Sequence, residues 1–206
     1  MLQPCQDNYS TTFDSYERMR RYHEKESAES LWRRCKVNEL HIEPLDKMSP
    51  LYETPSAFAA GVSRASIEDT AENLGLALQG EGAYYPVRST AYKSLLDRAK
   101  INGTALPKLS RQKLASVLND CLALYSAETL LLIRDEKISA THSGDSMDYS
   151  VLPIDELLKV LTRKLDDRFA GNVFQGGYCD HALAVASWSM PGQKEDLLGA
   201  YAKLLE

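Results

Sequence analysis

The chain has 206 residues, of which 44% are hydrophobic, 26% charged and 8% aromatic. This is the composition of an ordinary globular protein, which excludes collagen-like, low-complexity and wholly disordered chains. The formal net charge of −5 excludes attraction to nucleic acid by the global field of the protein, so any such attraction has to come from a local surface.

The amino terminus lacks the basic and apolar regions of a signal peptide, and no apolar run reaches the ~20 residues of a membrane span. The four cysteines match no C-x-x-C pattern: Cys5, Cys35, Cys121 and Cys179. This spacing favours free thiols in a reducing compartment. We therefore expect a cytoplasmic protein with no disulfide and no membrane segment, and we leave open whether the native chain continues past Glu206.

The amino-terminal part is predicted to be a helical arm followed by a linker. Apolar or aromatic positions recur at helical spacing within residues 14–36: Tyr16, Met19, Tyr22 and His23. Three prolines, which break helices, interrupt residues 44–62: Pro44, Pro50 and Pro55. The chain is therefore divided into an arm with a Pro-containing linker over residues 1–62 and a core domain over residues 63–206.

Three helices are predicted in the middle of the chain: residues 66–78, 90–101 and 110–124. Ser89 and Ser110 are placed to cap the second and third helices, and Asn102-Gly103 supplies a left-handed stop. The third helix has a regular apolar stripe: Leu114, Val117, Leu118, Cys121 and Leu122.

The last part of the chain alternates hairpins with helices. The predicted elements are strands 129–134 and 137–142 joined at Asp135-Glu136, a helix from Pro153 to about Phe169, strands 173–178 and 181–190, and a last helix from about 194 to 205. This ββαββα pattern predicts an α+β fold in which an antiparallel sheet from two hairpins is covered by helices.

Six stretches carry a resemblance to a known family: residues 89–99, 104–110, 132–137, 142–145, 149–153 and 176–178. They resemble the phage/plasmid-like family called domain of unknown function 932, over roughly residues 60–206. The resemblance implies a protein of a bacteriophage, plasmid or integrated element, where nucleic-acid handling or interference with host defence is expected. It implies no catalytic residues, because the family has no assigned chemistry.

Residues 85–113 are strongly basic, with seven Lys and Arg side chains against Asp97 alone. Cations that hold phosphates, interleaved with rings that stack on bases, are typical of single-stranded nucleic-acid binding. The candidate binding residues are Tyr85, Arg88, Tyr92, Lys93, Lys100, Lys108, Arg111 and Lys113. The alternative is that these cations form a solvated helical face and pair with acidic groups of the same protein.

A second group of residues has side chains that can ligate a metal: His142, Asp145, Cys179 and His181. If the two hairpins lie side by side, these residues could share a metal ion, and Cys-His nucleophilic catalysis is also conceivable. The spacing is not diagnostic of either chemistry, and polar turns would explain the same residues.

The common enzyme and cofactor signatures are missing from the sequence, so no catalytic residue and no cofactor are predicted. The leading hypothesis is a non-catalytic mobile-element protein that binds nucleic acid, in single-stranded form. One alternative is a protein-binding inhibitor or adaptor acting against host defence, which would dock a protein partner through the charged amino-terminal arm. A further alternative is a small metal-dependent hydrolase. The oligomeric state is left open.

Overall fold

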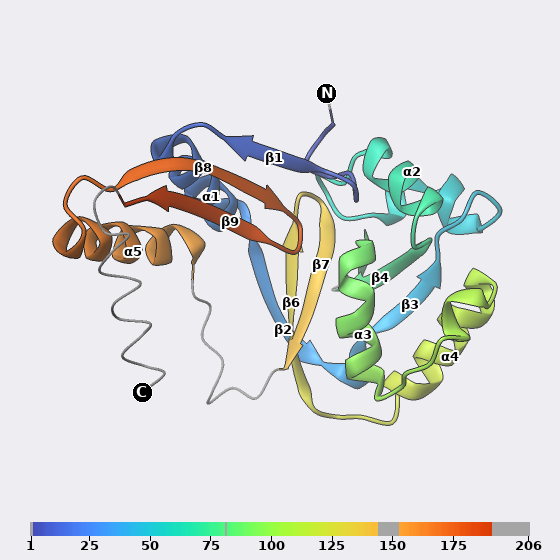
Figure 1. Ribbon diagram of the computed structural model, residues 1–206. Helices are drawn as coiled ribbons and strands as arrows, with labels where there is room; N and C mark the ends of the chain where they lie inside the picture. The colour runs from blue at the N-terminus through green and yellow to red at the C-terminus, as the bar shows by residue number, and fades with distance from the viewer. Residues whose placement is uncertain (1, 81, 144–152, 191–206) are drawn as a thin grey trace. The chain divides into compact units, whose positions relative to one another are not determined.

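The computed structural model describes residues 2–80, 82–143 and 153–190, and Figure 1 shows their ribbon. The chain divides into two compact units. The first unit comprises Met1–Tyr9 and Glu29–Ser150, and the second comprises Ser10–Ala28 and Val151–Glu206. Each unit therefore combines an amino-terminal piece with a later part of the chain.

The elements confirm the predicted α+β class. In chain order the strands and α-helices are β1 (Ser10–Phe13), α1 (Tyr16–Glu29), β2 (Leu31–Lys36), β3 (His41–Pro44), α2 (Arg64–Glu72), β4 (Leu76–Gly80), β5 (Ala83–Pro86), α3 (Tyr92–Ala99), α4 (Arg111–Leu122), β6 (Glu128–Arg134), β7 (Lys137–Ser143), α5 (Ile154–Arg168), β8 (Val173–Asp180) and β9 (Ala184–Ser189). Short 3₁₀ helices lie between some of them: η1 (Val37–Glu39), η2 (Pro50–Glu53), η3 (Pro55–Ala57), η4 (Ser89–Ala91) and η5 (Leu106–Lys108).

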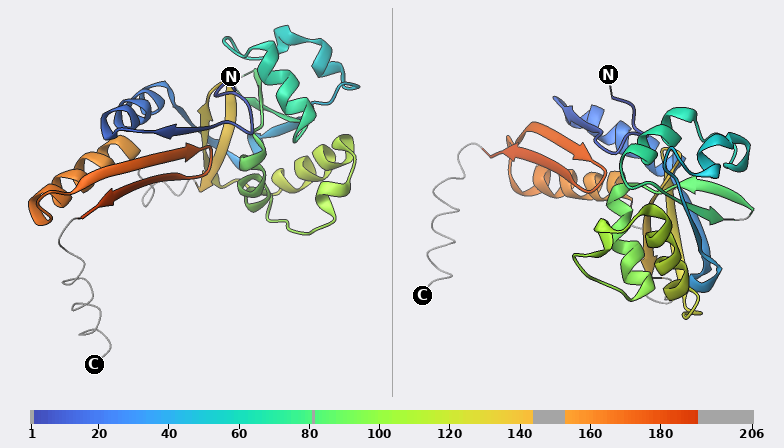
Figure 2. Two further views of the ribbon diagram at one scale, coloured as in Figure 1. Left: turned by 45° about the horizontal axis from the view of Figure 1, so that its top comes forward. Right: turned by 90° about the vertical axis from the view of Figure 1, so that its right-hand side faces the viewer.

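The first unit contains two antiparallel three-stranded sheets, with strand orders β2-β6-β7 and β3-β4-β5. A parallel bridge between Val87 and Ile138 connects β7 with the end of β5. Helix α4 packs on β3, and α3 packs on β7 and beside α4, as the views of Figure 2 also show. The main core lies between these strands and helices, and its fully buried side chains include Ile42, Leu76, Leu78, Leu95, Leu114, Leu118 and Ile138.

Residues 44–62 are part of a core, which corrects the predicted linker. They form η2 and η3, and their buried side chains join Ile67 of α2 and Ala77 of β4 in a second cluster: Leu45, Tyr52 and Phe58. Pro44 is the last residue of β3 and lies opposite Leu76 of β4, whereas Pro50 and Pro55 begin η2 and η3. The apolar residues between them nevertheless anchor the segment to the body of the first unit.

The second unit is one antiparallel sheet with strand order β1-β8-β9, packed against α1 and α5. Its buried core is small among the described residues: Phe13, Met19, Leu158 and Cys179. Gly177 of β8 permits the close approach of α1, because a Cβ atom there would lie 2.6 Å from the sulfur of Met19. Ala184 and Ala186 of β9 also pack against this core.

The sequence predicted the order hairpin, helix, hairpin correctly, and β6-β7, α5 and β8-β9 confirm it. The predicted union of both hairpins in one sheet is wrong. The hairpin β6-β7 pairs with β2, whereas β8 pairs with β1. The predicted last helix lies outside the described residues.

The predicted amino-terminal arm is also corrected. The helix ends at Glu29 instead of residue 36, because Leu31–Lys36 forms β2 and pairs with β6 along its whole length. Met19 and His23 of α1 are buried in the second unit. Residues 1–62 thus supply one strand to each of the three sheets: β1, β2 and β3. Because these strands pair with strands from later in the chain, residue 62 is not a boundary between two domains.

Two smaller predictions are resolved by the same geometry. The helix predicted over residues 66–78 is α2, which ends at Glu72 and gives way to β4. All four cysteines are free thiols, as expected. Among the described residues, no helix has both the length and the apolar character needed to cross a membrane.

Candidate functional site

The basic segment folds into η4, α3, η5 and α4 of the first unit. Ser110 caps α4 as predicted, because its hydroxyl accepts a hydrogen bond from the backbone N–H of Lys113 at 3.4 Å. The end of α3 differs from the prediction. Lys100, with φ 56°, adopts the left-handed conformation that was assigned to Asn102-Gly103, and Ser89 lies in η4 and does not cap α3.

Most of the predicted phosphate-binding cations lie on the surface. Lys93, Lys100, Lys108 and Lys113 are exposed. Arg111 is half-buried, and its guanidinium donates to the backbone oxygen of Asn73 at 3.0 Å. We call these five residues the basic surface. They lie on two helices that pack side by side and on the connection between them.

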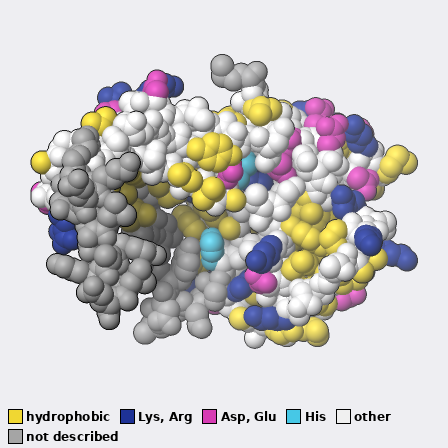
Figure 3. All heavy atoms as spheres, viewed as in Figure 1, with side chains coloured by type: hydrophobic (Ala, Val, Ile, Leu, Met, Phe, Trp, Pro, Cys, Tyr) yellow, Lys and Arg dark blue, Asp and Glu magenta, His cyan; other side chains and the backbone are white. Residues whose placement is uncertain are grey.

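In the described part of the chain, the cations of the basic surface are not paired with acidic groups. Within the described residues, no ion pair joins any of its five cations to a carboxylate. Exposed cations in other parts of the chain do form such pairs: Arg18 with Asp14, Lys47 with Glu72, Arg64 with Glu68 and Lys159 with Glu156. In Figure 3 the region of α3 and α4 shows Lys and Arg side chains around an apolar area, with few acidic groups between them.

The side chain of Arg111 packs against Gly75, close to the end of α2. Gly75 has a φ of +66°, and a Cβ atom at this position would lie 2.9 Å from Nε of Arg111. Glycine at this position therefore leaves room for the Arg111 side chain, and its positive φ also favours glycine. This packing makes Arg111 a structural as well as a charged residue of the basic surface.

Arg88 does not belong to the basic surface, which corrects the sequence prediction. Its side chain is 0% exposed. Its guanidinium donates to the hydroxyl of Ser139 and to the backbone oxygens of Gln6 and Pro4. Burial lowers the pKa of Arg88, and the carboxylate of Asp135 at 3.8 Å opposes this effect. Arg88 is therefore an internal anchor that cannot reach a phosphate outside the protein.

The two tyrosine rings that were predicted to stack on bases, Tyr85 and Tyr92, are not fully accessible either. Tyr85 is only 9% exposed and packs in the main core, with the guanidinium carbon of Arg33 5.4 Å from its ring centroid. Tyr92 is half-buried, and its hydroxyl is buried without a hydrogen-bond partner among the described residues. Base stacking on Tyr85 is thus excluded by its burial, and Tyr92 offers only part of one ring.

The predicted metal ligands that the structure describes are divided between the two units. His142 lies on β7 of the first unit, where its ring centroid is 5.5 Å from that of Trp32. Burial lowers the pKa of His142, and the nearby charge of Arg98 lowers it further. Cys179 and His181 belong to the second unit, and Asp145 lies outside the described residues.

One of these four residues does lie in a group of potential ligands. Cys179 is buried close to His23 and Glu26 of α1. The sequence placed His23 at helical spacing with Met19, but Glu26, which follows one turn later, was not predicted as a ligand. The spacing of three residues was the available signal, since residues i and i+3 share a helix face.

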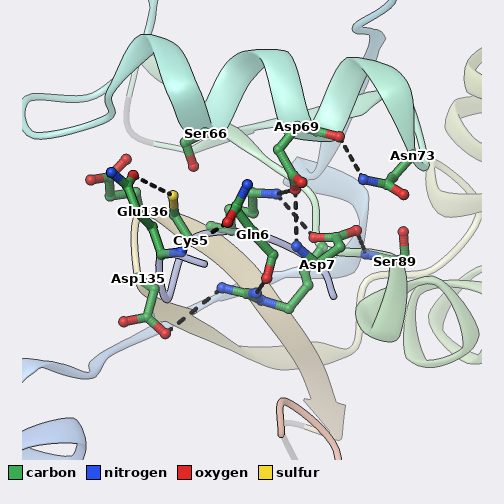
Figure 4. Close-up of polar contacts among 12 residues, drawn as sticks. Cys5, Gln6, Asp7, Ser66, Asp69, Asn73, Ser89, Asp135 and Glu136 are labelled. Atoms are coloured by element: carbon green, nitrogen blue, oxygen red, sulfur yellow. Dashed lines mark hydrogen bonds and ion pairs between the residues drawn. The ribbon is translucent and has the colours of Figure 1, made fainter. Parts of the chain in front are cut away.

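A buried ionic cluster in the first unit was missed altogether (Figure 4). Lys137 of β7 is 0% exposed, and its ammonium group donates to the carboxylates of Asp7, at 2.9 Å, and Asp69. The backbone N–H of Asp7 also donates to Asp69 at 3.0 Å, and the N–H of Ser89 donates to Asp7 at 2.8 Å. The cluster fastens the amino-terminal segment to α2, η4 and β7. Its burial and internal satisfaction indicate a structural role.

This cluster predicts a loss of stability in acid. Burial alone would raise the pKa of Asp7, but hydrogen bonds from Ser89 and the charge of Lys137 outweigh it, so the pKa is lowered from its ordinary 3.8. A carboxyl group with a lowered pKa in the folded state stabilises the fold above its unfolded pKa, and this contribution disappears as the pH falls through the folded pKa.

We therefore expect Asp7→Asn to lower the free energy of unfolding at pH 7 and to have a progressively smaller effect below about pH 4. Urea unfolding at a series of pH values measures both variants. The exposed change Asp14→Asn serves as the control, and its effect should stay below about 1 kcal/mol. An effect of Asp7→Asn that did not diminish in acid would contradict the assigned direction of the pKa.

A hollow of about 400 Å³ in the first unit is lined by residues outside the basic surface and the cluster of Figure 4: Arg33, Arg34, Cys35, Glu39, Leu40, Gln79, Gly80, Gly82 and Leu131. Burial, with a smaller contribution from the charge of Glu39, raises the pKa of Cys35 to about 11. This thiol is therefore protonated near neutrality and is a poor nucleophile, so the hollow lacks an activated group for covalent chemistry.

Comparisons of the chain with protein-family models, with curated proteins and with solved structures find no match. The resemblance to domain of unknown function 932 accordingly stays a prediction, and the function has to be argued from the geometry of this chain.

Proposed function

We propose that the protein is a non-catalytic nucleic-acid-binding protein that holds the phosphates of a single strand on its basic surface. The observation that carries this proposal is that five clustered cations have no ion pair with a carboxylate among the described residues. Intramolecular pairing was the alternative explanation for the basic segment, and the absence of such pairs counts against it. Exposed cations that are not paired with carboxylates keep their counterions, and a polyanion releases these counterions when it binds.

The burial of Tyr85 and Arg88 narrows the proposal. Phosphate contacts would supply the affinity. Of the two candidate stacking rings, Tyr85 and Tyr92, the half-buried Tyr92 is the one that could add a partial contact with a base. Binding should therefore depend on charge and salt far more than on base sequence. Origin in a mobile element stays an expectation from the sequence resemblance.

The other two candidate functions have less support. Docking of a partner through a free amino-terminal arm is disfavoured, because the inner face of α1 is buried in the second unit. A hydrolase built on His142, Asp145 and His181 lacks a described group that contains these side chains together. No specific observation favours either function.

A charge-reversal experiment tests the proposed function. We expect the wild-type chain to bind a labelled single-stranded oligonucleotide at low salt, with log K falling by about 0.7 per decade of salt for each phosphate contacted. Reversal of the four fully exposed cations of the basic surface to Glu should abolish this binding: Lys93, Lys100, Lys108 and Lys113. Fluorescence anisotropy measures the affinity. Each exposed substitution should change stability by less than about 0.5 kcal/mol.

The matched control reverses four exposed cations elsewhere, so that the net charge changes equally: Arg21, Lys36, Arg163 and Lys164. This control variant should bind much more tightly than the first variant, because local contacts and not global charge hold the strand. A double-stranded competitor of the same sequence tests the preference for single strands. Equal affinities of the two reversed variants, or no wild-type binding at low salt, would refute the proposal.

A further inference from the structure

The second unit contains three side chains of the kinds that bind transition metals, and none of them has a role in the basic surface. His23 and Glu26 lie one turn apart on α1, and Cys179 lies on β8, which packs against that helix. His23 is 1% exposed and Cys179 is 3% exposed. The helix and the strand are distant in sequence but belong to one compact unit.

We propose that His23, Glu26 and Cys179 form a zinc-binding site. One ligand atom from each side chain lies within 4.8 Å of the other two. Tetrahedral zinc, with bonds of about 2.0–2.3 Å, needs ligand atoms roughly 3.3–3.6 Å apart, so a movement of up to about 1 Å would complete the contacts. Nδ1 of His23 and a carboxylate oxygen of Glu26 are already 3.0 Å apart.

The polar groups of the cluster are incompletely satisfied in the protein alone. Nδ1 of His23 interacts with Glu26, but Nε2 is buried and has no hydrogen-bond partner among the described residues. The thiol of Cys179 lies 3.4 Å from the backbone oxygen of Asp180. Buried polar atoms are normally paired, so the unpaired Nε2 atom of His23 requires an explanation.

The donor set selects the metal. An imidazole nitrogen, a thiolate and a carboxylate are the three ligand types that Zn²⁺ takes in proteins, whereas Mg²⁺ and Ca²⁺ require oxygen ligands. Three protein ligands leave a fourth position for water. On binding, the S–H bond of Cys179 breaks, the sulfur donates its electron pair to Zn²⁺, and the proton passes to the buffer.

The same residues do not form a catalytic Cys-His pair. Such a pair needs the thiol within hydrogen-bond reach of an imidazole nitrogen and open to a substrate. Nε2 of His23 has no hydrogen-bond partner in the described part of the chain, and both side chains are almost completely buried. A small ion can reach and satisfy these atoms, whereas a substrate cannot. Zinc would join α1 to β8 and reinforce a unit whose described core cluster has, besides Cys179, the buried side chains of Phe13, Met19 and Leu158.

Cobalt binding tests the site with the full chain after removal of metals by a chelator. Co²⁺ is the probe, because a bound thiolate gives a near-ultraviolet charge-transfer band and tetrahedral coordination gives intense visible bands. We expect both signals to saturate at one equivalent and to disappear on addition of Zn²⁺. Zn²⁺ should also raise the melting temperature of the metal-free protein.

Variants separate this site from the other thiols of the chain. Cys179→Ser should abolish the charge-transfer band, and Glu26→Gln should keep the band but weaken Co²⁺ affinity at least about tenfold. Cys35→Ser and Cys121→Ser, which remove thiols of the first unit, should change neither signal. If Cys179→Ser fails to fold, the Glu26→Gln variant and the wild-type titration still decide. No thiolate band in the wild type, or binding unaffected by Glu26→Gln, would overturn the proposal.

Discussion

Replacement of Lys137 by Met should destabilise the protein by about 3–5 kcal/mol, which is typical when one partner of a buried ion pair is removed. The ammonium group of Lys137 is 0% exposed and lies between the carboxylates of Asp7 and Asp69. Met has a similar length, so the packing of the side-chain stem is retained. The loss therefore reports the removal of the ammonium group that lies between the carboxylates of Asp7 and Asp69.

Urea unfolding measures this loss, and two further variants show its origin. Lys47→Met is the matched control, because Lys47 pairs with Glu72 on the surface, and its effect should be about 0–1 kcal/mol. The triple change Lys137→Met, Asp7→Asn and Asp69→Asn should recover part of the stability, because no uncompensated charge remains buried. A loss from Lys137→Met no larger than the control would show that the cluster contributes little.

Replacement of Leu45 by Ala should destabilise the protein by about 2–5 kcal/mol, the cost of a cavity at a fully buried leucine. Leu45 is 0% exposed, packs in the cluster with Tyr52 and Phe58, and donates its backbone N–H to Gly75 at 2.8 Å. The prediction distinguishes the observed packing of residues 44–62 from the linker that their prolines suggest. A solvated linker would lose almost nothing from this substitution.

Met48→Ala is the control for Leu45→Ala, because Met48 belongs to the same segment and is 92% exposed. Its effect should stay within about 0.5 kcal/mol. Urea or thermal unfolding of both variants measures the difference. Equal and small effects of the two substitutions would contradict the burial of this segment.

Local sequence patterns were sufficient to predict helix α4 and the turn between β6 and β7. The stripe of α4 contains Leu114 and Leu118, which recur at helical spacing and are both buried. The turn at Asp135-Glu136 joins β6 to β7 with both residues at positive φ, the conformation of a two-residue hairpin turn. In these cases the hydrophobic period and the turn residues agree with the tertiary fold, so a short stretch of sequence is enough to predict the element.

Strand β2 shows where a local pattern misleads. Its sequence, Leu31–Lys36, continues a charged segment with residues that a helix tolerates, and only pairing with β6 makes it extended. The same pairing separates the two hairpins into different sheets. Strand β2 is stabilised by pairing with a strand that is distant in sequence. The residues next to β2 in the sequence therefore do not reveal its partner.

The candidate sites divide in the same way. The sequence by itself determined that positive charge is concentrated in residues 85–113, and Lys93, Lys100, Lys108 and Lys113 are indeed exposed. Only the tertiary structure decided that Arg88 of this segment is an internal anchor, because the groups that bury it come from the amino terminus and β7. It also brought Cys179 to the helix face of His23 and Glu26. Charge density and helical spacing are local properties, whereas burial and ligand clusters depend on which distant segments pack together.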